Sequence, residues 1–574
     1  MATASTRSAH CPCPDQCGRV RLTARISAHD SVAQFRLLAP YRDVTEGPRG
    51  RAQERAETCP TRQLSCGRRG AAMGVLDTFL QEDGPWPFVV PLLLLLALLA
   101  WSRRAPPGAR PPPGPRALPI IGNLHMLNTR RLHESLLQLS KQYGSVFTVY
   151  LGPRRVVVLA GYETVMDALV NYEEEFGARD IWPIFRDTNK EHGIAFANGE
   201  CWRTMRKFTL STLKDFGMGK RILEEKILEE IGHLTQVFQE QNGKPFEARQ
   251  DVSVAVSNII CSIVYGKRFE YSDPNFVKMI KRTAENTKIV GMPGIQIYNC
   301  FPFLGPLISS RAKAIENMEQ NKAEILSFVR ESQRCQQGDD AKGFIDAFLH
   351  KQKQESQNPN SLFNDENLVV TVLNLFVAGT DTTAMTICWC LLLMAKYPEV
   401  QRQLQQEIDN TIGTRPPKME DQKEMTYTKA VIHEIQRFSN IVPLNLPHKV
   451  TTDVHFRGYL IPKGTTVIPL LTSVLRDEAH WATPNEFNPS HFLDADGNFV
   501  ENKAFLPFSA GPRVCVGKTL TRMELFLFLT ALLQNFTFTP PPGVTTDQLD
   551  LTPAIGLLLS PTPQELCAIR RSQN

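Results

Sequence analysis

The chain has 574 residues, of which 42% are hydrophobic and 21% are charged, so it can bury a large core and is not a disordered protein. The formal net charge is +5, but residues 1–72 alone hold twelve arginines against six acidic residues, which leaves −1 for residues 73–574. The body of the chain therefore gives no sign of a basic surface for nucleic acid.

Residues 1–72 form an arginine-rich extension without hydrophobic periodicity. Ala71-Ala72-Met73-Gly74 has the composition of a translated start-codon context, so one hypothesis is that the working protein begins at Met73. The rival hypothesis is a targeting presequence, which the six acidic residues disfavour. Five of the thirteen cysteines fall in this extension, and the other eight are scattered with no C-x-x-C pair, which favours a reducing compartment over a disulfide scaffold or a zinc site.

A membrane anchor is predicted in the region 73–104, with its hydrophobic core at 86–101. This core carries no charge and would span roughly 24 Å as a helix. A tryptophan stands at each end, and Arg103 and Arg104 follow directly, which predicts that the rest of the chain faces the cytoplasm. A cleaved signal peptide and a buried core helix are the alternatives, but acidic residues precede the core and a proline-rich stretch follows it.

A proline-rich hinge is predicted at 105–118, because the stretch from Pro106 to Pro115 is too rich in proline to form a helix. The remaining residues, 119–574, are expected to form one domain.

The most distinct helix of the body is predicted from Asp365 to Lys396. Asn364 can cap it, acidic residues occupy its first turn and Pro398 ends it. Asp381 at its centre argues against a membrane span. Four further helices are expected, at Phe208–Glu240, Val400–Ile412, Thr428–Phe438 and Thr519–Asn535.

Strand-like segments are fewer and shorter. They are Ser145–Tyr150, Val156–Leu159, Thr465–Leu470 and a C-terminal hairpin near Gly556. The fold class predicted from this balance is mainly α with a small β-rich part.

A single cysteine stands out near the C-terminus, in the stretch FSAGPRVCVGK. Gly511 and Gly517 allow the backbone to approach a flat cofactor closely, and a helix begins just after Cys515, so that its amides favour a thiolate. Arg513 can pair with an acidic group of the cofactor, and Phe508 can shield the sulfur from water. A lone buried cysteine in a turn is the alternative interpretation.

Four further motifs accompany this loop. They are the segment AGTDTT from Ala378 to Thr383, the EIQR motif from Glu434 to Arg437, the FNPSHF segment that contains His491, and the WRTMR segment from Trp202 to Arg206. Together with the cysteine loop they resemble the cytochrome P-450 family over about residues 73–574. Within that family the chain looks like a vertebrate microsomal family-two enzyme, closest to the K and W subfamilies.

The resemblance implies the P-450 fold, with haem b held between the long central helix and the helix after the cysteine loop, and with Cys515 as the axial thiolate ligand of the iron. It implies that the haem propionates contact Arg179, Trp202, Arg206, His448 and Arg513, although Arg179 and His448 could each be an ordinary surface group. Glu434, Arg437 and His491 are expected to form a structural triad.

The resemblance also assigns Asp381 and Thr382 as an acid–alcohol pair that delivers protons during oxygen activation, and Gly379 as a gap that lets oxygen approach. The substrate pocket is expected to be lined by Asn374, Ala378, Val442, Leu446 and Leu557. Arg203, Arg206 and Lys207 provide a positive face for an acidic electron donor. The expected donor is NADPH–cytochrome P-450 reductase, with cytochrome b5 as a second candidate, at the endoplasmic reticulum membrane.

The predicted function is a membrane-anchored monooxygenase that inserts one atom of O₂ into fatty acids or xenobiotics. One alternative is a haem-thiolate isomerase or dehydratase that rearranges lipid peroxides without a reductase; enzymes of that kind tend to lack the acid–alcohol pair. A non-catalytic haem sensor is a further alternative.

Overall fold

A computed structural model describes residues 89–94, 110–335 and 341–572 of the chain. The extension 1–72, the hypothetical start at Met73 and most of the hydrophobic core 86–101 lie outside these residues. Residues 89–94 are helical, and the side chains of Val90, Leu92, Leu93 and Leu94 in this segment are exposed.

The described part of the predicted hinge does not stand free of the body. The carbonyl of Pro113 accepts a hydrogen bond from the Thr148 amide at 2.7 Å, and the carbonyl of Arg110 accepts one from the Leu460 amide at 2.9 Å. A Cβ on Gly114 would lie 1.9 Å from the Thr148 carbonyl oxygen, so only glycine permits this approach. The end of the proline-rich segment is therefore extended and hydrogen-bonded to the body.

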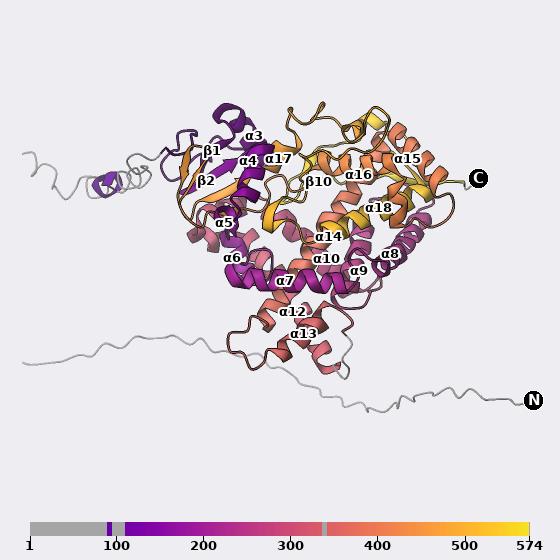
Figure 1. Cartoon of the computed structure of the whole chain (residues 1–574), viewed down its shortest axis with the longest axis horizontal. Helices are drawn as coiled ribbons and strands as arrows, with labels where there is room; N and C mark the ends of the chain where they lie inside the picture. The colour runs from indigo at the N-terminus through magenta and orange to yellow at the C-terminus, as the bar shows by residue number, and fades with distance from the viewer. Residues whose placement is uncertain (1–88, 95–109, 336–340, 573–574) are drawn as a thin grey trace, which may run out of the picture. The chain divides into compact units, whose positions relative to one another are not determined.

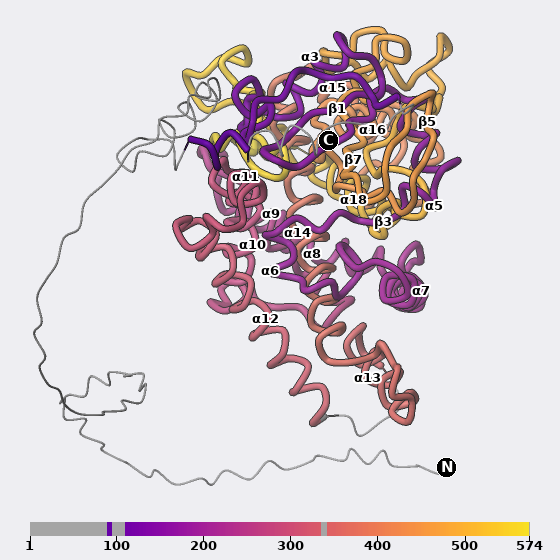
Figure 2. The backbone as a smooth tube through the Cα atoms, turned by 90° about the vertical axis from the view of Figure 1, so that its left-hand side faces the viewer, coloured from indigo at the N-terminus to yellow at the C-terminus, as the bar shows by residue number. Residues whose placement is uncertain are grey.

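The helix α14, Asp365–Lys396, runs through the middle of the body (Figures 1 and 2). Its bounds are those predicted, and the Asn364 side chain accepts a hydrogen bond from the Asn367 amide as the expected cap. Among the described residues it is the one helix long and apolar enough to cross a membrane, but 72% of its most apolar window is buried within the protein.

Other helices pack around α14. The predicted helices near 400–412, 428–438 and 519–535 are confirmed as α15 (Pro398–Thr411), α16 (Thr426–Ser439) and α18 (Lys518–Asn535). The remaining long helices are α3 (Leu132–Tyr143), α9 (Arg249–Val264), α10 (Pro274–Val290), α12 (Ser309–Cys335) and α13 (Phe344–Gln354). The shorter ones are α4 (Tyr162–Met166), α5 (Glu173–Phe176), α6 (Pro183–Asn189), α11 (Pro293–Cys300) and α17 (Leu471–Leu475).

The prediction of one helix from Phe208 to Glu240 is wrong. Two helices occupy this region, α7 (Gly199–Asp215) and α8 (Arg221–Glu240). Between them Gly217 and Gly219 have φ angles of 96° and 81°, which a right-handed helix cannot contain. The two glycines end the first helix and allow the chain to turn.

Within the described residues the β part consists of one five-stranded sheet and three two-stranded sheets. The larger sheet has the order β1-β2-β7-β4-β3, in which β1 and β2 are antiparallel and β2 and β7 are parallel. Its strands are β1 (Val146–Leu151), β2 (Arg154–Leu159), β3 (Ala178–Arg179), β4 (His448–Lys449) and β7 (Thr466–Pro469). The smaller sheets pair β5 (Val454–Phe456) with β6 (Tyr459–Ile461), β8 (Phe536–Thr539) with β11 (Cys567–Arg570), and β9 (Pro553–Ala554) with β10 (Ser560–Pro561).

The predicted strands are confirmed to within two residues, and the hairpin expected near Gly556 is the β9–β10 pair. The largest hydrophobic core lies among α8, α9, α14, α16 and α18, and a second core lies beneath the five-stranded sheet. The mainly helical class with a small β part is therefore confirmed.

Candidate active site

Cys515 lies between the short helical turn Gly511–Arg513 and the start of α18. Its amide donates a hydrogen bond to the carbonyl of Phe508 at 3.1 Å, which closes the loop. Gly511 has a φ of 71°, and a Cβ there would lie 1.9 Å from the Leu169 carbonyl oxygen, so the loop requires glycine at this position. Gly511 was predicted to let the backbone approach a flat cofactor closely. In the structure the close approach that it permits is to the backbone of Leu169.

The Cys515 side chain is exposed, whereas the other cysteines with described side chains are half-buried or buried. Burial nevertheless raises the pKa of the Cys515 thiol, and this exceeds the opposite effects of the Gly517 and Lys518 amides and of Arg206. The helix amides lower the pKa as predicted, and a bound metal cation would further favour the thiolate.

Arg179 and His448 face each other from the paired strands β3 and β4. The Arg179 Nη1 donates to His448 Nε2 at 2.6 Å and to the Leu446 carbonyl at 2.9 Å, while His448 Nδ1 donates to the Phe176 carbonyl at 2.7 Å. Both side chains are buried, so neither is the solvated surface group that was the alternative for them.

Arg513 belongs to the loop FSAGPRVCVGK that contains Cys515, here called the ligand loop, and Arg206 belongs to α7. Arg513 lies over the Trp202 ring at 3.8 Å and donates to the Gly177 and Ala197 carbonyls. Arg206 donates to the Val514 carbonyl at 2.5 Å, next to the ligand cysteine. The structure thus brings together the five side chains predicted to bind the propionates.

This cluster lacks anions. Among the described residues no carboxylate pairs with Arg179, Arg206 or Arg513. Burial and the neighbouring guanidinium groups lower the pKa of Arg179 to about 9 and that of Arg513 to about 8, and they lower the pKa of His448 well below its usual value. Buried N–H groups of Arg179 (Nε) and Trp202 (Nε1) have no hydrogen-bond partner.

A group carrying two carboxylates would supply the missing charge and the missing acceptors at once. The haem propionates have this chemistry, and the iron is a cation for the Cys515 sulfur. The residues present therefore fit haem.

The central turns of α14 contribute the predicted acid–alcohol pair. Within this buried helix Ala378 is exposed and Thr382 is half-buried, and the Thr382 hydroxyl donates to the Ala378 carbonyl at 2.6 Å. Asp381 is 3% exposed; Thr287 of α10 donates to its Oδ2, and its Oδ1 has no partner. Burial raises the pKa of Asp381 to about 6, partly offset by Thr287 and Arg249.

Gly379 was predicted to leave a gap through which oxygen approaches, and this physical reason for the glycine is wrong. A Cβ at Gly379 would lie 2.4 Å from the Ile260 Cδ1 of α9. The missing side chain therefore allows α9 and α14 to pack closely.

The side chains predicted to line the substrate pocket have different tasks. Val442, Leu446 and Leu557 are half-buried and apolar. Asn374 uses its amide to hold the segment after α6: its Oδ1 accepts from the Ile194 and Ala195 amides at 3.1 Å, and its Nδ2 donates to Asn189 at 2.9 Å. The polar atoms of Asn374 are therefore committed to holding this wall.

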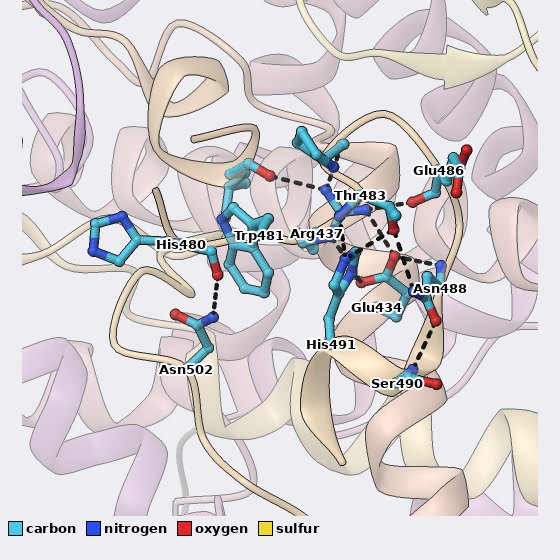
Figure 3. A network of polar contacts seen from close by, with 12 residues as sticks. Glu434, Arg437, His480, Trp481, Thr483, Glu486, Asn488, Ser490, His491 and Asn502 are labelled. Atoms are coloured by element: carbon cyan, nitrogen blue, oxygen red, sulfur yellow. Dashed lines mark hydrogen bonds and ion pairs between the residues drawn. The ribbon is translucent and has the colours of Figure 1, made fainter. Parts of the chain in front are cut away.

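The predicted triad is present, as Figure 3 shows. Arg437 binds both oxygens of Glu434 at 2.7 Å, and both side chains are fully buried. His491 Nε2 accepts the Thr483 amide at 3.1 Å, so its Nδ1 carries the hydrogen and donates to Glu434 at 3.2 Å. Arg437 also donates to the carbonyls of Leu475, Pro484 and Glu486, and Asn488 donates its amide to Glu434.

Asn198 is a site residue that sequence reasoning missed. Its Oδ1 accepts from the Arg179 amide at 2.7 Å and from Arg513 Nη2 at 3.0 Å, and its Nδ2 donates to the Arg179 carbonyl. Its position before α7 is typical of a helix cap, yet its side chain makes no capping bond. This different use of Asn198 follows only from the tertiary structure, which brings β3 and the loop that contains Arg513 next to its side chain.

These features define a haem-thiolate protein with a mainly helical fold. The family profile described as "Cytochrome P450" matches residues 112–568. The chain is 51% identical over 503 residues to cytochrome P450 2K1 of Oncorhynchus mykiss, covering 87% of this chain and 100% of the relative. It is 53% identical over 457 residues to cytochrome P450 2K6 of Danio rerio, covering 79% and 90%. It is 47% identical over 481 residues to cytochrome P450 2F2 of Rattus norvegicus, covering 83% and 98%.

The chain therefore belongs to the cytochrome P450 family. It is a monooxygenase that binds haem through a cysteine thiolate.

Replacing Arg437 by Ala is expected to destabilise the protein by about 3–5 kcal/mol, because Glu434 would be left as an unpaired buried carboxylate. Thermal unfolding and the haem content of the purified protein measure the effect. Arg402→Ala is the matched control, since its pair with Glu399 is exposed at the surface and its loss should leave the unfolding temperature close to that of the wild type. Equal stability of the two variants would contradict a structural triad.

Replacing Trp202 by Phe is expected to speed haem loss about tenfold, because the ring under Arg513 remains but one charge-assisted donor is removed. Transfer of haem to an excess of apomyoglobin measures the rate. Unchanged haem loss would show that the indole N–H does not bind a propionate.

Proposed function

We propose that this monooxygenase oxidises lipophilic substrates, medium- and long-chain fatty acids first and xenobiotics second, with electrons from NADPH delivered by a reductase. The exposed stretch of α14 at Ala378 and Thr382 carries this proposal. It is exposed in the middle of a buried helix, and the apolar side chains of Val442 and Leu446 are half-buried. An accessible alanine beside one hydroxyl, on a helix that is otherwise buried, suits an apolar substrate that is oxidised at carbon.

When bound, the haem supplies the metal at which dioxygen is reduced, and the protein orients, protonates and excludes water. Asp381 has a pKa near the physiological range, so it can gain and lose a proton at working pH. The Thr382 hydroxyl is bonded to the Ala378 carbonyl of its own helix, so a small rotation turns it into the space beside that turn. Asp381 and Thr382 are adjacent on a helix, so their side chains lie on neighbouring faces of α14.

Membrane attachment is supported by exposed apolar side chains at two segments. Leu118, Ile120, Ile121 and Met126 belong to the chain after the hinge, and Ile297, Phe303 and Leu307 belong to α11 and the turn after it. Both segments flank the β1–β2 turn: a Cβ on Gly122 would lie 2.5 Å from the Gly152 carbonyl oxygen, and one on Gly152 would lie 3.0 Å from Cys300. Such a contiguous patch suits a lipid surface.

Reductase docking is supported by α7. Arg203 and Lys207 are exposed on this helix, while Arg206 of the same helix is bonded to the backbone of the ligand loop. An acidic electron donor held by these cations would lie close to Cys515. Cytochrome b5 is proposed as a second donor to the same face.

A peroxide isomerase or dehydratase is the alternative function. It would need neither reductase nor proton delivery, so the buried Asp381 with its hydrogen-bonded partner favours the monooxygenase.

Reconstitution with reductase and NADPH under ¹⁸O₂ is the test of the proposed function. Lauric and arachidonic acids are expected to give hydroxy or epoxy acids that carry one ¹⁸O atom, measured by mass spectrometry. Intact haem without any fatty-acid product would overturn the lipid assignment in favour of xenobiotics. Conversion of a lipid hydroperoxide without NADPH would favour the isomerase.

Replacing Thr382 by Ala is expected to lower the product formed per NADPH consumed by about tenfold or more, because a hydroxyl needed for proton delivery is lost. Thr382→Ser should retain most of the coupling. Thr386→Ala is the matched control, since Thr386 lies one turn further on and donates only to the Thr382 carbonyl. Equal losses in the Thr382→Ala and Thr386→Ala variants would indicate a general effect on the helix.

A further inference from the structure

A cavity of about 1410 Å³ lies between α9, α10 and the β9–β10 hairpin. Its wall includes Arg249 and Ser253 of α9, Thr287 and Lys288 of α10, and Asp381 and Met385 of α14. None of the side chains proposed to bind haem lines it. Asp381, which is adjacent to Thr382 in α14, therefore lines a cavity that none of the proposed haem-binding side chains line.

Thr287 holds Asp381 at this wall. Its Oγ1 makes a short hydrogen bond to Asp381 Oδ2 and lies 3.1 Å from the Thr283 carbonyl oxygen. The hydroxyl has one hydrogen, so it can donate to only one of these oxygens at a time. The backbone of Thr287 is fixed as well, because its carbonyl accepts a hydrogen bond of 3.0 Å from the amide of Leu557, which lies in the hairpin.

We propose that Thr287 is a positioning residue for proton delivery, whose hydroxyl exchanges donor and acceptor roles as Asp381 gains and loses a proton. This inference rests on the monooxygenase function proposed above. When Asp381 is ionised, Thr287 donates to Oδ2. When Asp381 takes up a proton from a solvent hydronium ion that has entered the cavity, leaving water behind, the new carboxyl O–H donates to Thr287 Oγ1, and the Thr287 hydrogen turns to the Thr283 carbonyl. Thr287 itself neither gains nor loses a proton.

The charged groups around Asp381 do not replace this contact. Arg249 is engaged by Glu247 at 3.6 Å and by the Pro561 carbonyl at 2.5 Å, and its influence on Asp381 ranks below that of Thr287. The other charged side chains at the wall come from α10 and from the segments before α9 and α3, and the hairpin contributes none. They are Lys281, Glu285, Lys288, Glu247, Arg130 and Arg131. Thr287 is therefore the one hydrogen-bond donor to the Asp381 side chain among the described residues.

The test compares Thr287→Val with Thr287→Ser in the haem-loaded enzyme supplied with reductase and NADPH. The readout is product formed per NADPH consumed as a function of pH. In the wild type this coupling should fall as pH rises through the pKa of Asp381, about 6, because the proton carrier is then ionised. The valine variant loses a bond that favours the carboxylate, so the midpoint should move up by about one pH unit, a tenfold change in acid strength.

Thr287→Ser should keep the wild-type midpoint, because it keeps the hydroxyl. Thr283→Val is the matched control: Thr283 lies one turn earlier on α10, and its hydroxyl donates to the Met279 carbonyl. The inference is overturned if Thr287→Val keeps the wild-type midpoint, or if the serine and valine variants shift it equally. If the valine variant does not fold, Thr287→Ala makes the same comparison.

A second readout separates this inference from the proposed function. The infrared carbonyl band of protonated Asp381, identified by its absence in Asp381→Asn, can be titrated without turnover. A higher midpoint in Thr287→Val than in Thr287→Ser supports the positioning role even if no fatty acid is oxidised. Equal midpoints overturn it even if oxygenation is normal.

Discussion

The fully buried ion pair between Glu434 and Arg437 is the interaction on which the rest of the structure depends. Its two parallel hydrogen bonds of 2.7 Å satisfy the carboxylate, and the remaining donors of Arg437 hold carbonyls from residues 475–486. Removing two charges from water is costly unless every donor and acceptor is used, and here the network is complete. It fixes α16 to the long segment that leads to the ligand loop. The neighbouring His433 packs against Phe492 and Phe505 along the same path.

The haem site has the opposite character, because its network is incomplete in the protein alone. Arg179, Arg206 and Arg513 are drawn together without a carboxylate, and burial lowers their affinity for protons. Folding around this excess of positive charge is unfavourable until two propionates supply the missing negative charge. The structure therefore couples haem binding to stability: the groups that the apoprotein leaves unsatisfied are those that the cofactor satisfies.

The helix α14 separates two environments. At Ala378 and Thr382 its surface is accessible, and one residue away Asp381 lines the cavity between α9, α10 and the β9–β10 hairpin. A helix places adjacent residues about 100° apart, so an Asp-Thr dipeptide can serve both sides without any break in the backbone. The bond from Thr287 and the close packing of Gly379 against α9 fix which side each residue faces.

The sequence by itself determined the helical class, the bounds of α14 and the contacts of Glu434, Arg437 and His491, because each depends on local spacing or on a motif with few alternative uses. It also predicts Cys515 as the haem ligand and the side chains that bind the propionates, through the resemblance of its motifs to the family. Tertiary structure decided the rest. The break at Gly217, the role of Asn198, the use of Asn374 to hold a wall and the packing reason for Gly379 all depend on residues distant in the chain. The contact between Thr287 and Asp381 joins residues 94 positions apart, and a single threonine in a helix carries no local signal of it. Periodicity and motifs report what a segment can form, whereas a contact between segments is fixed only when their faces are packed together.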